Sequence, residues 1–200
     1  VTEEFFRSVV EISLERIDDP QENYEQGDFR SPNGGTLECK RQPIGRYPRN
    51  FIEVCERTSG RNAAHLTGFE DLASVLAIDF GDLMQVGVNE RGVRSAFGRP
   101  TAISVSVTSL LRAAYWVYVN PASSQRFLYI YRSRDLLDLV RKAVKADGLE
   151  LGKGNSNDDT YAVLVPNPAW RWTSKHDADW RFSGEGSETT ALHALRTSLA

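Results

Sequence analysis

The chain has 200 residues, 40% of them hydrophobic and 26% charged, with a formal net charge of −3 and an isoelectric point near 5.7. No apolar run approaches the roughly 18 to 20 residues that a membrane-spanning helix needs, so we expect no membrane span. Two cysteines, Cys39 and Cys55, are too few for a disulfide framework and have no zinc-site spacing. The N-terminal stretch lacks the basic start and unbroken apolar segment of a signal peptide, which predicts a cytoplasmic protein.

The acidic balance does not by itself indicate a nucleic-acid binder, since non-specific binding to phosphates depends on basic surface. Arginines nonetheless gather in the middle of the chain, whereas acidic residues dominate its beginning. These arginines are Arg41, Arg46, Arg49, Arg57, Arg61, Arg91, Arg94 and Arg99. A polyanionic partner and a solvated basic face explain this pattern equally well.

The first third of the chain predicts one helix and three strands. Apolar residues at helical spacing predict a helix from Thr2 to about Asp18, with Thr2 as N-cap and Pro20 beyond its end. Turns rich in Gly and Pro separate the three short strands that follow, at 23–29, 36–42 and 50–57. A small antiparallel meander is the natural interpretation of these strands.

The rest of the chain alternates strands with amphipathic helices. Helices are predicted at 68–80, at 134–147 with Ser133 as N-cap, and at 188–200. Strands are predicted at 101–107, 113–119, 127–132 and 160–166, and 167–182 is expected to be irregular. We find no repeat at a fixed period and no low-complexity linker, so we expect one mixed α/β domain over 1–200. Its core would span about 1–148, with 149–200 packed on it.

The segment 27–42, GDFRSPNGGTLECKRQ, predicts a one-sided charged hairpin. Successive side chains of a strand face opposite sides, so Glu38 and Lys40 share one face and their apolar neighbours share the other. If the preceding strand pairs with this one, Asp28 lies beside Glu38 on the charged face. A surface hairpin with an ordinary Glu–Lys pair is the alternative interpretation.

These side chains have a definite chemical use if they converge. Two carboxylates, from Asp28 and Glu38, with the backbone carbonyl of Cys39 would suit Mg²⁺, which takes few protein ligands and keeps waters and phosphate oxygens. Lys40 could orient or help to deprotonate an attacking water and offset the developing negative charge. The hairpin therefore predicts a metal site that acts on a phosphodiester.

GDF followed by GGTLECK resembles the Asp…Glu-x-Lys signature of the PD-(D/E)xK, or restriction-endonuclease-like, nuclease superfamily, with Asp28, Glu38 and Lys40 in the three signature positions. Gly27 stands where a proline usually precedes the aspartate. The segments 46–58, 107–119 and 127–140 are similar to phage-type and resolvase-like members. The resemblance covers roughly 1–145. It implies an α-β-β-β-α-β core with a mixed central sheet flanked by helices, Mg²⁺-dependent cleavage with Mn²⁺ as a substitute, and often a homodimer.

The same resemblance implies further residues at the site. In many members a glutamate of the first helix joins the metal, and Glu11 and Glu15 are the candidates here, with Glu53 on a later strand as a third. Apart from the resemblance, the basic residues Arg41, Arg46 and Arg49 are the expected DNA contacts, and the polar loop 152–159 is a further one. The tryptophans after position 169 are expected to anchor the C-terminal part to the core, with stacking on bases as the alternative.

Three functions remain open from the sequence. The leading hypothesis is a Mg²⁺-dependent endodeoxyribonuclease of the restriction or junction type, with DNA as partner. The second is a catalytically idle DNA-binding or assembly protein of the same fold. The third is an unrelated α/β interaction protein, which follows if Asp28 and Glu38 lie far apart.

Overall fold

We describe the fold from a computed structural model. It describes residues 1–41, 49–57, 67–79, 103–105, 111–120, 126–147, 150–151, 160–168, 170–175, 179–184 and 186–200. The chain divides into two compact units. The first unit comprises Val1–Pro48, Ser109–Leu136 and Asn167–Ala200, and the second comprises Arg49–Thr108 and Leu137–Pro166. The fold is mixed α/β, as predicted, and the expectation of a single domain stays a prediction.

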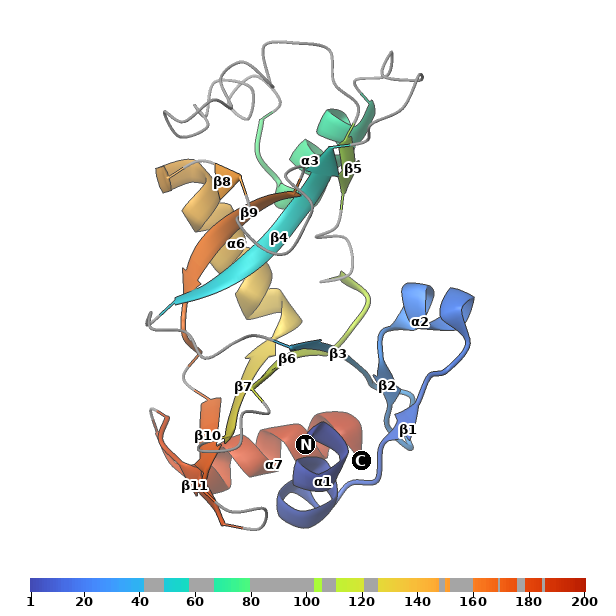
Figure 1. Cartoon of the computed structure of the whole chain (residues 1–200), viewed down its shortest axis with the longest axis vertical. Coiled ribbons are helices and arrows are strands. Elements are labelled where there is room, and N and C mark those ends of the chain that lie inside the picture. The colour runs from blue at the N-terminus through green and yellow to red at the C-terminus, as the bar shows by residue number, and fades with distance from the viewer. Residues whose placement is uncertain are drawn as a thin grey trace. The chain divides into compact units, whose positions relative to one another are not determined.

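A seven-stranded sheet in the order β1-β2-β3-β6-β7-β10-β11 forms the frame of the first unit (Figure 1). Its strands are β1 (Glu15–Arg16), β2 (Phe29–Arg30), β3 (Thr36–Arg41), β6 (Tyr115–Asn120), β7 (Arg126–Arg132), β10 (Trp170–Ser174) and β11 (Trp180–Phe182). Strands β3 and β6 run parallel, and every other neighbouring pair is antiparallel. A parallel pair requires a long crossover connection. The chain between β3 and β6 supplies it and includes part of the second unit.

The first helix is shorter than predicted. The helix α1 (Thr2–Phe5) continues as the π-helical turn η1 (Phe6–Val10) and ends there, because Glu11 adopts a left-handed conformation with φ of 65°. The predicted helix to Asp18 is therefore wrong in its second half. Glu15 lies in β1, which pairs with β2.

A helix stands where a strand was predicted over 23–29. In α2 (Pro20–Gln26) the proline occupies the first turn, and the Asp19 side chain caps the helix by accepting a hydrogen bond from Glu22 N at 2.8 Å. Aspartate at the N-cap followed by proline at the first helical position is a strong start signal. Pro20 therefore begins a helix instead of following one.

The predicted meander is also wrong. Strand β3 pairs with β2 on one side and with β6 on the other, and β4 (Arg49–Arg57) belongs to the sheet of the second unit. The charged hairpin thus belongs to a larger mixed sheet, in which β6 is hydrogen-bonded to β3 on the side away from β2.

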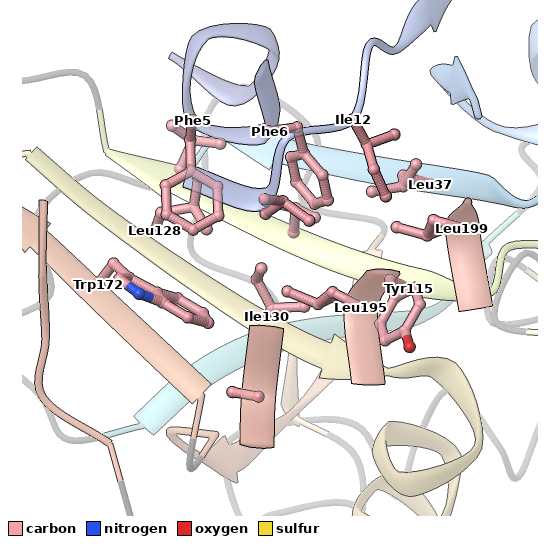
Figure 2. Close-up of a cluster of buried hydrophobic side chains, with 14 residues drawn as sticks. Phe5, Phe6, Ile12, Leu37, Tyr115, Leu128, Ile130, Trp172, Leu195 and Leu199 are labelled. Carbon is pink, nitrogen blue, oxygen red and sulfur yellow. The ribbon is translucent and has the colours of Figure 1, made fainter. Parts of the chain in front are cut away.

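The core of the first unit lies between one face of its sheet and the helices α1, η1 and α7 (Glu188–Leu199) (Figure 2). Trp172 of β10 is fully buried there. The centroid of its ring lies 5.0 Å from that of the Phe5 ring and 5.1 Å from that of the Phe182 ring. Its indole N–H donates to Glu188 Oε1 at 2.9 Å. Trp172 thus anchors the C-terminal part to the core, as expected, but residues 167–182 form β10 and β11 instead of an irregular segment.

Replacing Trp172 with alanine is expected to lower the free energy of unfolding by about 3–5 kcal/mol, because it removes a large buried ring and leaves Glu188 without its donor. Chemical denaturation of the wild type and the variant measures this difference. Leu111, which is 60% exposed, provides the control, since Leu111→Ala should change the stability by less than about 0.5 kcal/mol. Equal effects of the two substitutions would contradict the anchoring role.

The second unit holds a four-stranded antiparallel sheet in the order β5-β4-β9-β8. Its other strands are β5 (Ile103–Val105), β8 (Glu150–Leu151) and β9 (Thr160–Pro166), and its helix α3 spans Thr67–Leu76. The helix α6 (Ser133–Asp147) begins in the first unit and continues in the second. Ser133 is its first residue, and the hydroxyl of Ser133 is buried with no hydrogen-bond partner in the described residues, so the predicted cap is wrong.

Candidate metal centre

The charged hairpin forms as predicted, with Asp28 directly before its first strand. Strands β2 and β3 pair in the register Phe29↔Leu37, and the turn is closed by a hydrogen bond from Ser31 N to Gly35 O at 2.8 Å. Leu37 is fully buried in the core of the first unit. Alternation along β3 therefore places Glu38 on the opposite face of the sheet.

The Asp28 carboxylate is bound to β3 at Cys39. The Asp28 Oδ2 atom accepts a hydrogen bond from the Cys39 backbone N–H at 2.6 Å. The backbone N–H of Asp28 donates to Leu37 O at 2.9 Å. A second donor, the Asn23 side-chain amide, reaches Oδ1 at 3.1 Å. Hydrogen bonds to an ionised acceptor are stronger than neutral ones, so these contacts define where the carboxylate lies.

Glu38 and Lys40 form an ion pair on the face opposite the core. Glu38 Oε1 lies 2.5 Å from Lys40 Nζ. Glu38 is only 9% exposed, whereas about half of the Lys40 side chain is open to solvent. The ammonium also lies 5.6 Å from the centroid of the Trp116 ring, which faces Glu38 in the register of β3 and β6. Lys40 therefore has two attractive neighbours, a carboxylate and an aromatic face.

Gly27, directly before Asp28, lies close to the Glu38 carboxylate. An ideal Cβ at Gly27 would lie 3.5 Å from Glu38 Oε2, and Asp28 is the next residue along the chain. Both carboxylates also act electrostatically on the Cys39 thiol. Asp28 is thus hydrogen-bonded to Cys39, and Glu38 and Lys40 are its neighbours on β3, while the joint action of these residues as a metal site stays a prediction.

The thiol of Cys39 stays protonated at neutral pH. Its pKa is raised to about 12, mainly by burial and also by the negative charges of Asp28 and Glu38, while the hydrogen bond with Thr2 and the Lys40 ammonium act in the opposite direction. A thiol needs its thiolate form to bind a metal or to act as a nucleophile. Cys39 also shares its strand face with Leu37 and packs against the core, so its side chain lies on the face opposite Glu38, and the backbone carbonyl stays the predicted ligand.

The predicted donor set would suit a hard cation such as Mg²⁺. It consists of two carboxylates and one backbone carbonyl, all of them oxygen ligands, and Mg²⁺ commonly binds proteins through one or two carboxylates. Within the residues that the structure describes, no group of three or more His, Cys, Asp and Glu side chains could hold a metal ion. A site on this hairpin would thus leave most of the coordination sphere to water and substrate.

The three supporting glutamates lie in different surroundings. Glu11 ends η1 and forms an ion pair with Arg196 of α7, at 2.9 Å between Oε2 and Nη2. Glu15 is exposed on β1, and Glu53 is exposed on β4 of the second unit. Their participation in the site stays a prediction.

The expected DNA contacts are described only in part. Arg41 ends β3 and is exposed. Arg49 begins β4 of the second unit. Arg46 and the loop 152–159 lie outside the described residues. The sequence reasoning missed Asn23 and Trp116, because their contacts with Asp28 and Lys40 depend on a helix and a strand pairing that the local pattern does not show.

Comparison with protein-family models, with curated protein sequences and with solved structures finds no significant match. None of the described helices is long and apolar enough to cross a membrane.

Proposed function

We propose that the chain is a metal-dependent endonuclease that hydrolyses phosphodiester bonds of DNA. The observation that carries this proposal is the hydrogen bond from the Cys39 N–H to Asp28 beside the Glu38–Lys40 ion pair. The hydrogen bond holds Asp28 at the strand that carries Glu38 and Lys40, and these three residues occupy the positions that the PD-(D/E)xK signature implies.

The order of elements supports a restriction-endonuclease-like core. A helix, α1 with η1, precedes three neighbouring strands β1, β2 and β3, and β6 then adds to β3 in parallel. The crossover between β3 and β6 contains the helix α3. This sequence of elements is compatible with the α-β-β-β-α-β order that the resemblance implies if the helix α2, between β1 and β2, and the strands of the second unit are additions to it.

The roles of the site residues follow from their chemistry. Asp28 and Glu38, with the Cys39 carbonyl, would hold Mg²⁺ or Mn²⁺. When bound, such an ion stabilises negative charge on the phosphodiester and lowers the pKa of a coordinated water. Lys40 carries a positive charge at the solvent-exposed end of the site, where it can contact the phosphate and orient the attacking water.

DNA is the proposed substrate, cut in the manner of a restriction or a junction enzyme. A homodimer would suit either, because a twofold axis relates two identical sites to the two strands of a duplex.

The test is cleavage of supercoiled plasmid, branched DNA and single-stranded DNA by the wild type with Mg²⁺, with Mn²⁺ and with a chelator. We expect metal-dependent cleavage of at least one substrate. Lys40→Ala should reduce the rate about 10²- to 10⁴-fold, because the group that orients the water is lost.

Lys145→Ala is the matched control, since Lys145 is an exposed lysine in the last turn of α6. It should cleave like the wild type. No cleavage by the wild type on any of the three substrates would overturn the proposal and favour a catalytically idle DNA-binding protein of the same fold. Equal rates for the wild type and Lys40→Ala would remove Lys40 from the mechanism.

A further inference from the structure

The helix α2 is attached to the hairpin by two separate sets of polar contacts. In the first, the Arg30 guanidinium of β2 binds Glu22 and also donates to Gln26 Oε1 at 2.6 Å. In the second, the Asn23 amide donates to Asp28 Oδ1 at 3.1 Å and to Ile17 O at 3.3 Å. Only the second set reaches a residue of the candidate metal centre.

The amide of Asn23 completes the environment of the Asp28 carboxylate. Both partners of Asn23 are acceptors, so its nitrogen, the donor, must face them. With Cys39 N–H on Oδ2, each oxygen of Asp28 then accepts one N–H. These two hydrogen bonds restrict rotation of the carboxylate and leave lone pairs on both oxygens for a cation.

Metal affinity depends on such outer partners, because a ligand that is already oriented loses less freedom when the metal binds. We propose that Asn23 is a positioning residue, which holds the Asp28 carboxylate in the orientation that the divalent cation requires. The inference rests on the proposed metal site, and it assigns to α2 a role in binding the ion.

The alternative is that Asn23 only closes the loop between β1 and β2. The backbone already provides that closure, since Ile17 N–H donates to Asp28 O at 3.0 Å. The bond from Asn23 to Ile17 O can support that closure, whereas the bond from Asn23 to Asp28 Oδ1 also constrains the carboxylate.

The experiment compares two variants of α2 in the full chain. Asn23→Ala removes the contact with Asp28, and Gln26→Ala removes a contact of the same helix with Arg30. Isothermal titration calorimetry with Mn²⁺ gives the dissociation constant, and thermal unfolding without metal gives the stability. We expect Asn23→Ala to raise the dissociation constant for Mn²⁺ about 10- to 100-fold, and Gln26→Ala to leave it within about twofold. At saturating Mn²⁺, Asn23→Ala should recover most of the wild-type cleavage rate.

The outcomes separate the inference from the proposed function. An unchanged dissociation constant in Asn23→Ala, or an equal increase in both variants, would overturn the positioning role and leave only a structural one. A wild type that binds Mn²⁺ but cuts no DNA would overturn the nuclease, while the two dissociation constants would still decide the role of Asn23. A wild type that binds no Mn²⁺ would overturn the metal site and this inference together.

Discussion

Replacing Glu38 with glutamine is expected to weaken Mn²⁺ binding by about 100-fold or more and to abolish metal-dependent cleavage, with little change in stability. Glutamine preserves the shape of a side chain that is only 9% exposed but removes its negative charge, on which affinity for a hard cation depends. The lost ion pair costs little, because the Lys40 ammonium lies at the solvent-exposed end and can be hydrated. Calorimetry with Mn²⁺ and the plasmid assay measure the two effects.

Glu22→Gln is the matched control for Glu38→Gln. It makes the same chemical change in the first unit, where Glu22 pairs with Arg30 and takes no part in the candidate site. Its dissociation constant for Mn²⁺ should equal that of the wild type. The same affinity in Glu38→Gln and Glu22→Gln would rule out Glu38 as a metal ligand.

We expect Glu38→Gln and Lys40→Ala to differ in their effects on Mn²⁺ affinity and on the cleavage rate. The Lys40 ammonium occupies Oε1 of Glu38 and so competes with a cation for that carboxylate. Removing it should leave Mn²⁺ affinity unchanged or higher while the cleavage rate falls. Glu38→Gln should lose binding and cleavage together. This contrast would distinguish Glu38, the proposed metal ligand, from Lys40, the proposed group that acts on the attacking water.

Local patterns were sufficient to predict the charged face of the hairpin. Alternation along a strand requires only neighbouring residues, so the opposite orientations of Leu37 and Glu38 could be read directly. Helical periodicity likewise predicted α6 and α7, whose apolar positions are buried. In each case the element and its buried face are determined by residues that are close in sequence.

The same pattern failed where apolar residues are buried without a helix. Ile12 and Ile17 continue the spacing of the first helix and are each only 5% exposed, yet they lie outside any helix, beyond Val10. Tertiary contacts bury them, so the sequence shows a helical repeat that the backbone does not follow. The pairing of β3 with β6 also escaped prediction, because a long crossover joins these two strands and no local pattern identifies the partner.

The shape of the candidate metal centre depends on Gly27, which stands where the PD-(D/E)xK signature usually has a proline. Gly27 has φ of +105°, which proline cannot adopt because its ring holds φ near −65°. An ideal Cβ at this position would lie 2.8 Å from Leu37 O, the acceptor of the Asp28 N–H. The missing side chain therefore permits the close approach of β2 and β3 that brings Asp28 to Cys39.

Gly27→Ala is expected to destabilise the protein by at least about 1–3 kcal/mol and to weaken Mn²⁺ binding, because the new Cβ must push the Leu37 carbonyl away and shift both carboxylates.

Gly34→Ala is the control. Gly34 also has positive φ, at +81°, but nothing lies within 4 Å of its ideal Cβ. Gly34→Ala should therefore lose stability through backbone strain alone and keep the Mn²⁺ affinity of the wild type. If both variants bind Mn²⁺ as the wild type does, the close approach at Gly27 is not what forms the site. If only Gly27→Ala loses affinity, the geometry of the centre depends on this glycine as much as on its charged residues.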